Sequence, residues 1–434
     1  MAADTSRTAR IRALARTDRR QALQLLQKLL SELFGMQAEQ IEINDDQYSL
    51  NSLNGFFHSA GTDYFFKFHQ EEGEEAMSGE YYRADILAQA GFPVDQPVHV
   101  SARAGEQILI YQRRSDPRFS DVLRELDFAD DTPAIDRALD AERDLCRTLL
   151  AVYRRTLHPI TPGQSADEPI HRLFHERLVD ATSKQFPGGR FADFYVGKPF
   201  RFPGGLILDW RDFAACRFVI NGRPYARTIG ELFQAAEQRL RPRSLADGGG
   251  VVAHGDAHNA NVWYGEQSGK AVLSYFDPAF AGRHVPSLMA EIKPTFHNIF
   301  AHPLWLYEPA AASRRFTARA EIKGRQLWVE TDWHLSAVRQ ALLDLKAKHL
   351  WRPLLQELQK QRLLPADWRD VIRLGLFLSP TLVMSLRAGA KNHDPISSMI
   401  AFAVAVMVGS PPDNGTDIVN TFLDQIDPVQ PEIA

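Results

Sequence analysis

Cysteine is scarce in this chain of 434 residues, which contains only Cys146 and Cys216. The two cysteines lie far apart, and neither has a companion at the spacing of a metal-binding pair. A disulfide framework and a zinc–thiolate site are therefore not predicted. Such cysteine usage is typical of a reducing compartment, and we expect a cytoplasmic protein.

Long apolar runs are also lacking. The run from Met399 to Val408 is too short to cross a bilayer, and the first residues lack the continuous apolar core of a secretory signal. We therefore expect no membrane association.

Charge of one sign is not in excess, because 50 lysines and arginines face 54 aspartates and glutamates, for a formal net charge of -4. This balance gives no electrostatic reason to expect a nucleic-acid partner. The hydrophobic content of 44% is that of an ordinary globular protein, and the length allows two or three structural units.

The order of predicted elements divides the chain near Arg113. Before that point, apolar spacing predicts a helix over 20–34, and alternating patterns predict strands over 40–44, 56–59, 64–69 and 107–112. After it, helical patterns dominate. We therefore expect an α+β chain with an antiparallel-sheet domain over 1–112 and a larger, mostly helical domain over 113–434.

In the helical part, the sequence pattern predicts one long helix and two hairpins at defined residues. A helix is predicted over Asp140–His158, with Glu142 on its solvent side. Asn221-Gly222 is a strong signal for a tight hairpin turn, and a second hairpin is predicted to turn near Lys323-Gly324.

The stretch HGDAHNANVWYGEQSGKAVLSYFDP, starting at His254, holds the polar residues that point to chemistry. Asp256 and Asn261 are five residues apart, so that one loop can hold a carboxylate near a substrate hydroxyl and an amide oxygen on a divalent cation. This is the H-x-D-x-x-x-x-N spacing of the protein-kinase catalytic loop. Two short apolar runs flank GEQSGK, and the hairpin they predict returns Asp277 beside Asn261. Asn261 and Asp277 are therefore candidate metal ligands.

Phosphoryl transfer also needs a lysine that neutralises the phosphates of the nucleotide. Lys67 lies in the predicted strand YFFKFH and could reach the α- and β-phosphates. Glu80, in the next predicted helix, is placed to pair with Lys67. The strand containing Ile110 and Gln112 is a candidate hinge, whose backbone groups can bind an adenine edge.

At these residues the sequence resembles the aminoglycoside phosphotransferase and choline kinase-like family. The family signature H-G-D-x-H-x-x-N is matched by His254, Gly255, Asp256, His258 and Asn261. The resemblance implies a two-lobed, protein-kinase-like fold with a small antiparallel-sheet N-lobe and a larger, mostly helical C-lobe. It also implies a role for each of these residues. Asp256 would be the catalytic base, and Asn261 and Asp277 would bind magnesium. Lys67 and Glu80 would position the phosphates, while His254 and His258 would support the loop.

Two features of the motif leave alternatives open. A zinc site at His254, Asp256 and His258 is chemically conceivable, but it leaves Asn261 and the hairpin to Asp277 unexplained. Many relatives also carry a further aspartate that braces the catalytic loop, where this sequence offers Ser287 or Glu291.

We therefore expect a kinase that uses ATP and Mg²⁺ to phosphorylate a hydroxyl group of a small molecule. The alternative is a regulatory pseudokinase that binds nucleotide without transferring phosphate. A protein acceptor is a third possibility, which the resemblance disfavours. The sequence does not identify the acceptor, the preference for ATP or GTP, or the oligomeric state.

Overall fold

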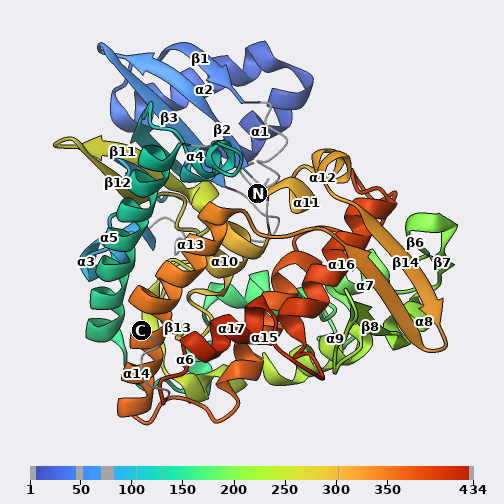
Figure 1. Ribbon diagram of the computed structural model, residues 1–434. Helices are drawn as coiled ribbons and strands as arrows, with labels where there is room; N and C mark the ends of the chain where they lie inside the picture. The colour runs from blue at the N-terminus through green and yellow to red at the C-terminus, as the bar shows by residue number, and fades with distance from the viewer. Residues whose placement is uncertain are drawn as a thin grey trace. The chain divides into compact units, whose positions relative to one another are not determined.

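The computed structural model describes residues 6–44, 52–69, 83–103, 105–129, 131–301 and 303–429. Helices and strands both contribute substantially, so the α+β class is confirmed. The chain forms two compact units, one from residues 1–88 and 94–116 and the other from 89–93 and 117–434 (Figure 1). The two domains expected over 1–112 and 113–434 stay a prediction.

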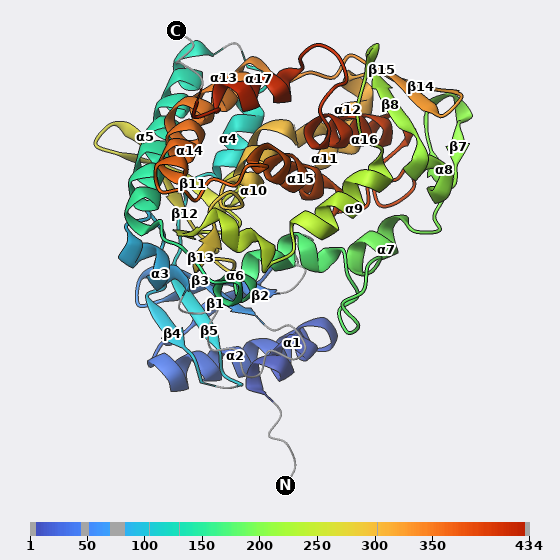
Figure 2. The same ribbon diagram turned by 90° about the horizontal axis from the view of Figure 1, so that it is seen from below.

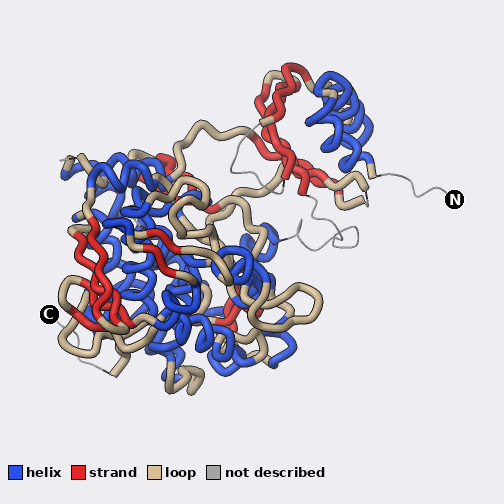
Figure 3. The backbone as a smooth tube through the Cα atoms, turned by 90° about the vertical axis from the view of Figure 1, so that its right-hand side faces the viewer, coloured by secondary structure: helices blue, strands red, loops and turns tan. Residues whose placement is uncertain are grey.

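The first unit is built on a five-stranded sheet with the order β1-β2-β3-β5-β4, in which every neighbouring pair is antiparallel. Two helices cover one face of this sheet (Figure 3), and their apolar side chains form a core with the strands. The elements are α1 (Arg7–Thr17), α2 (Arg19–Phe34), β1 (Glu39–Ile43), β2 (Ser52–Ser59), β3 (Thr62–His69), β4 (His99–Ser101) and β5 (Ile108–Gln112).

Local sequence explains the limits of these elements. Helix α2 begins at the Asp18 cap, whose carboxylate accepts from the N–H of Gln21, and ends at Gly35 with a φ of 69°. This confirms the helix predicted over 20–34. Strands β2 and β3 are joined by Ala60 and Gly61, which both have positive φ, as a two-residue hairpin turn requires. The predicted meander is thereby confirmed.

The second unit is mostly helical. Its helices are α4 (Phe119–Leu126), α5 (Thr132–Thr156), α6 (Pro162–Ala166), α7 (Gly189–Tyr195), α8 (Trp210–Ala215), α9 (Ile229–Arg239), α10 (Ile292–Thr295), α11 (Pro303–Leu306), α12 (Pro309–Arg315), α13 (Ala337–Lys346), α14 (Arg352–Lys360), α15 (Trp368–Thr381), α16 (Pro395–Gly409) and α17 (Ile418–Gln425). Helix α3 (Arg83–Ala90) includes residues of both units and is followed by Gly91 with a φ of 91°.

The strands of the second unit form small sheets. They are β6 (Phe200–Arg201), β7 (Ile207–Leu208), β8 (Arg217–Ile220), β9 (Arg223–Pro224), β10 (Gly250–Ala253), β11 (Val262–Gln267), β12 (Lys270–Tyr275), β13 (Gly282–Pro286), β14 (Ala318–Lys323) and β15 (Gln326–Thr331). The hairpins predicted at Asn221-Gly222 and near Lys323-Gly324 are both confirmed. They join in one sheet of order β14-β15-β8-β9, because β15 pairs with β8 in parallel.

Helix α5 confirms the long helix predicted over Asp140–His158, but the expected position of Glu142 is wrong. Glu142 is 1% exposed, and its carboxylate lies 3.0 Å from the Nζ atom of Lys346 on α13. The helical pattern could not show that a lysine from a distant helix lies opposite this residue. The ion pair allows a carboxylate to be buried at a position that is otherwise read as solvated.

Helices α15 and α16 form the apolar centre of the second unit (Figure 2). The run from Met399 to Val408 lies in α16 and is almost entirely buried within the protein. Among the described residues, no helix combines the length and apolarity needed to cross a membrane.

Candidate functional site

The motif of residues 254–261 follows a buried strand. Strand β10 pairs antiparallel with β13, and the chain leaves it at Ala253 to form the loop around Asp256. Gly255 has a φ of 78°, and a Cβ atom there would lie 2.3 Å from the carbonyl oxygen of Phe280. Glycine is thus required both by the backbone conformation and by the lack of space.

His254 connects this loop to the following hairpin. Its side chain is buried, its Nε2 atom lies 3.0 Å from the carbonyl oxygen of Phe276, and its Nδ1 atom lies 3.4 Å from the main-chain N of Asp256. Burial lowers the pKa of His254, so the ring is neutral, with Nε2 donating and Nδ1 accepting. Both ring nitrogens are therefore engaged within the loop, which leaves neither for the zinc site considered above.

The hairpin brings Asn261 and Asp277 to the same place. Strands β11 and β12 pair from Val262 with Tyr275 onwards, and the N–H of Phe276 donates to the carbonyl of Asn261 at 3.0 Å. The side-chain amide of Asn261 donates to the main-chain carbonyl of Asp256 at 3.0 Å, so that its Oδ1 atom faces away from this bond. The predicted hairpin is confirmed, and it brings together at its base Asn261 and Asp277, whose side chains carry oxygen atoms of the kind that suit a hard divalent cation.

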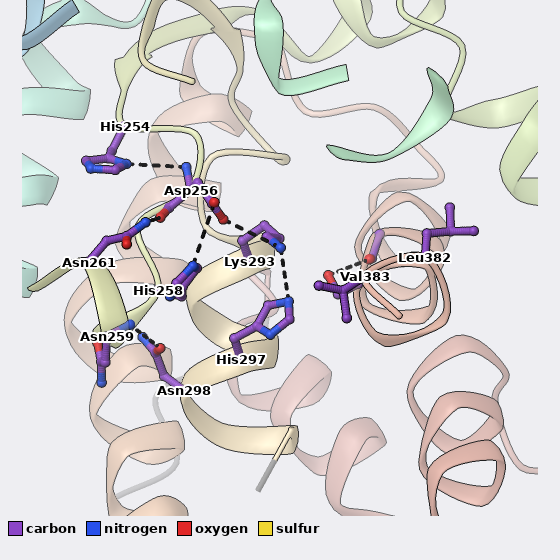
Figure 4. Close-up of polar contacts among 12 residues, drawn as sticks. His254, Asp256, His258, Asn259, Asn261, Lys293, His297, Asn298, Leu382 and Val383 are labelled. Carbon is purple, nitrogen blue, oxygen red and sulfur yellow. Dashed lines mark hydrogen bonds and ion pairs between the residues drawn. The ribbon is translucent and has the colours of Figure 1, made fainter. Parts of the chain in front are cut away.

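The carboxylate of Asp256 lies near Lys293 and His258 (Figure 4). Its Oδ1 atom is 3.5 Å from the Nζ atom of Lys293, and its Oδ2 atom is 3.7 Å from Nε2 of His258. Burial alone would raise the pKa of Asp256, but Lys293, His258, His254 and Arg177 outweigh it and hold the pKa below its ordinary value. Asp256 is thus ionised at neutral pH and able to accept a proton.

Lys293 was not found from the sequence, although it lies closest to the carboxylate of Asp256. It lies on α10, is 4% exposed, and its Nζ atom is 3.1 Å from Nε2 of His297. Burial lowers the pKa of His297 well below its ordinary value. A neutral His297 that accepts from Lys293 carries its proton on Nδ1, which lies 2.6 Å from the hydroxyl of Tyr307.

The open question of the loop brace also has a structural answer. Glu291 is engaged elsewhere, since its carboxylate accepts from the hydroxyl of Tyr153 at 2.6 Å and lies 3.4 Å from Lys346. The main-chain N–H of Ser287 donates to Gly249, before the loop begins. Instead, Asn298 contacts the loop, because its Oδ1 atom accepts from the main-chain N–H of Asn259 at 2.7 Å.

The predicted nucleotide-binding residues lie in the first unit. Lys67 is on β3, where it is paired with Asn54 on β2 and Leu109 on β5. The carbonyl of Ile110 accepts a hydrogen bond from the N–H of Val98 at 2.7 Å. Gln112 ends strand β5 and has an exposed side chain. Glu80 lies outside the described residues, and the roles of all four residues stay predictions.

Comparisons with known proteins give distant structural matches only. No protein-family model and no curated protein matches the sequence. A spectinomycin phosphotransferase in complex with ADP and spectinomycin is 14% identical, with a TM-score of 0.37, over 88% of this chain and 98% of that one. A thermostable mutant of an aminoglycoside phosphotransferase, in a ternary complex with AMP-PNP and hygromycin B, is 12% identical with a TM-score of 0.42 over 88% and 98%.

A choline kinase from Streptococcus pneumoniae is similarly distant, at 12% identity and a TM-score of 0.37 over 84% of this chain and 98% of that one. These proteins carry the names of the family that the motif beginning at His254 resembles. The identities and TM-scores are too low for the likeness to carry an argument about this chain, so the residues described above have to support any function.

Proposed function

We propose that this chain is a magnesium-dependent kinase with a two-lobed, protein-kinase-like fold, which transfers the γ-phosphoryl group of ATP to a hydroxyl of a small molecule. One observation carries the proposal. Asn261 is hydrogen-bonded to the main chain of Asp256 and, through the hairpin, lies beside Asp277. A single loop and hairpin thus supply one ionised carboxylate and two oxygen ligands in the order that phosphoryl transfer requires.

The proposed step assigns Asp256 the role of base. Its carboxylate accepts the proton of the acceptor hydroxyl as the oxygen attacks the γ-phosphorus. The new O–P bond forms while the bond from the γ-phosphorus to the β–γ bridging oxygen breaks, and ADP leaves with that electron pair. Asp256 is suited to this role because Lys293 and the other groups near it hold its pKa low, which keeps it ionised, and its side chain remains 15% exposed to an incoming group.

The other residues position the reactants. The Oδ1 atom of Asn261 and the carboxylate of Asp277 are hard oxygen donors and would hold magnesium. When bound, the metal neutralises charge on the transferred phosphoryl group. Lys67 would bind the α- and β-phosphates, and Glu80 would orient Lys67 by an ion pair. His254 and His258 would support the loop, with His254 fixing its path through Phe276.

The test separates nucleotide binding from transfer. The melting temperature of the full chain is measured with ATP, and separately with GTP, with and without Mg²⁺. Nucleotide at a hundredfold above Kd adds about 2.7 kcal/mol to the free energy of unfolding, which raises the melting temperature by several degrees. A magnesium-dependent rise that Asp277→Ala removes, and that Asp136→Ala on the exposed face of α5 retains, supports the site.

Transfer is then measured as acceptor-dependent release of ADP in a screen of small alcohols. Asp256→Asn should abolish turnover while it retains the nucleotide-induced shift. Unchanged turnover would exclude Asp256 as the base. Nucleotide binding without transfer to any small alcohol or to protein in a labelled lysate would favour the pseudokinase alternative, and the absence of any nucleotide shift would reject both.

A further inference from the structure

Three basic side chains gather on one side of Asp256. Lys293 lies 3.5 Å from its carboxylate, as described above. Arg177, at the end of the 3-10 turn His175–Arg177, and Arg190, on α7, both donate from Nη1 to the carbonyl of Leu382 at 3.3 Å. Arg190 also lies 3.3 Å from the carbonyl of Val383.

Hydrogen bonding to the C-terminal end of α15 explains only part of why two arginines lie here. Leu382 follows α15, and carbonyl groups at the C-terminus of a helix attract cations. One arginine would suffice for that purpose, whereas two guanidinium groups on one carbonyl repel each other. Burial, and then the neighbouring charge of Arg190, lower the pKa of Arg177 to about 10, although Asp256 acts in the opposite direction. The buried charge of Arg177 is therefore costly to maintain without an anion.

Asp256 is a single carboxylate that acts on both Lys293 and Arg177. It favours the charged forms of both Arg177 and Lys293, while Arg177 opposes the charge of Lys293. Within the described part of the chain, Arg177 has no carboxylate at ion-pair distance. The ammonium group of Lys293 has three N–H donors, but its described polar neighbours are only Asp256 and His297.

The position of the cluster distinguishes it from the metal ligands. In Figure 4, Asn261 and Lys293 lie on opposite sides of Asp256, and Leu382 and Val383 lie beyond Lys293. If the metal and the nucleotide phosphates occupy the side of Asn261, the acceptor hydroxyl approaches Asp256 from the side of the basic cluster. The remainder of the acceptor then lies against Lys293, Arg177 and Arg190.

We propose that the acceptor is an anionic alcohol, whose carboxylate or phosphate group binds to Lys293, Arg177 and Arg190 while its hydroxyl faces Asp256. This inference rests on the proposed kinase function. Guanidinium groups bind carboxylates and phosphates through paired N–H donors, and a buried ammonium group adds a point charge. A cationic acceptor at the same place would meet the like charges of Arg177 and Lys293.

The experiment compares acceptors that share a vicinal diol and differ in the charge of the group attached to it. Glycerate and glycerol 3-phosphate are the anionic probes, glyceramide is neutral, and 3-aminopropane-1,2-diol is cationic. Binding to the full chain saturated with MgADP is measured by thermal shift and titration calorimetry, and transfer from ATP is measured as release of ADP. Glycerate and glycerol 3-phosphate should bind more tightly than the other two, and the stronger of the pair distinguishes a carboxylate site from a phosphate site.

Substitutions of Arg177 test whether the preference for anionic acceptors depends on the basic side chains. Arg177→Gln should weaken anion binding roughly tenfold or more, since a charge-assisted hydrogen bond is lost. Arg177→Lys keeps the charge and should restore most of the affinity. Arg241→Gln removes an exposed arginine that pairs with Glu237 and is the matched control, with no expected change. The melting temperature of each variant without ligand shows whether it is folded.

The outcomes separate this inference from the kinase proposal. Preference for the amine or the amide, or no difference among the four probes, overturns the anionic acceptor while the magnesium-dependent nucleotide shift can still support the kinase. Anion binding that depends on Arg177 in a protein without a nucleotide shift would retain the basic site and reject the kinase.

Discussion

The Oδ1 atom of Asn298 accepts a hydrogen bond from the main-chain N–H of Asn259 at 2.7 Å, and so connects the π-helical turn Phe296–Phe300 to the loop around Asp256. Both residues are buried. The main-chain carbonyl of Asn298 in turn accepts from Arg339 at 2.6 Å, and Arg339 forms a buried ion pair with Asp127 at 2.8 Å. The loop around Asp256 is thus braced by the side-chain amide of Asn298.

The first prediction concerns this brace. Asn298→Ala leaves the N–H of Asn259 buried without an acceptor, which should lower the free energy of unfolding by about 1–3 kcal/mol. Turnover should fall as the loop loses its support. Asn298→Asp keeps an oxygen acceptor and should retain most of both. Urea denaturation and steady-state kinetics provide the measurement, and equal effects of the two substitutions would contradict the role.

Gly255 gives a second prediction with a close control. Gly255→Ala places a Cβ atom 2.3 Å from the carbonyl oxygen of Phe280, whereas Gly269→Ala has the same backbone conformation and nothing within 4 Å. Their φ angles are 78° and 77°, so that both variants pay the same cost for a left-handed alanine.

The difference between these two variants therefore measures the steric clash alone. Gly255→Ala should be less stable than Gly269→Ala by roughly 1–3 kcal/mol, the usual cost of overpacking. Thermal and urea denaturation of both proteins give the comparison. Equal stability would show that the loop can move away from Phe280 without cost.

Much of the fold and the local part of the site could be predicted from sequence. The turn at Ala60-Gly61 and the hairpin between Val262 and Tyr275 were predictable because apolar alternation and turn residues act over a few positions. The same holds for the proximity of Asn261 and Asp277, which follows from the hairpin. These features depend on neighbours in the chain.

The basic side of the site could not be predicted in this way. Lys293 and Arg177 act on Asp256 from separate elements, and no spacing within the sequence relates them to it. Glu142 was misplaced for the same reason, since only the tertiary structure brings Lys346 to it. Charged residues in helical patterns are ordinarily read as solvated, so pairs of buried charges are the positions where this reading fails.

The buried cluster around Lys346 gives the third prediction. Lys346 lies 3.0 Å from Glu142 and 3.4 Å from Glu291; burial would lower the pKa of Lys346, but these carboxylates keep it well above its ordinary value. Lys346→Met leaves two buried carboxylates without their cation and should cost about 3–5 kcal/mol of stability.

Two further variants make this prediction specific. Adding Glu142→Gln to Lys346→Met removes one of the stranded charges and should recover part of the loss. Lys360→Met removes a lysine with a side chain 77% exposed and should change stability by less than about 1 kcal/mol. Chemical denaturation measures all three proteins, and similar values for Lys346→Met and Lys360→Met would contradict the importance of the buried cluster.

The fourth prediction is a dependence of stability on pH. His171 is 1% exposed, its Nε2 atom donates to the carbonyl of Ser165 at 2.7 Å, and burial lowers its pKa from 6.5 to about 4. Between these two values the unfolded chain binds a proton at His171 and the folded chain does not. Stability is therefore lost as the pH falls from about 6.5 towards 4, by up to roughly 3 kcal/mol from this residue.

His171→Gln keeps a donor for Ser165 but removes the titration. The free energy of unfolding of the wild type minus that of the variant should therefore decrease as the pH is lowered through this range. Urea denaturation at a series of pH values gives both curves. Parallel curves would show that His171 does not contribute to the loss of stability in acid.

The fifth prediction separates the two functions of Asn261. Its amide nitrogen holds the main-chain carbonyl of Asp256, and its Oδ1 atom is the proposed magnesium ligand. Asn261→Asp keeps an oxygen ligand but loses the donor, whereas Asn261→Leu loses both.

The concentration of Mg²⁺ that gives half of the nucleotide-induced thermal shift should rise roughly tenfold or more in Asn261→Leu, because metal sites already lose this much when only a supporting contact is removed. In Asn261→Asp the magnesium requirement should stay close to that of the wild type while turnover falls, since the loop that holds Asp256 is released. If both variants need the same magnesium concentration as the wild type, Asn261 supports the loop and the metal must be held by other oxygen atoms.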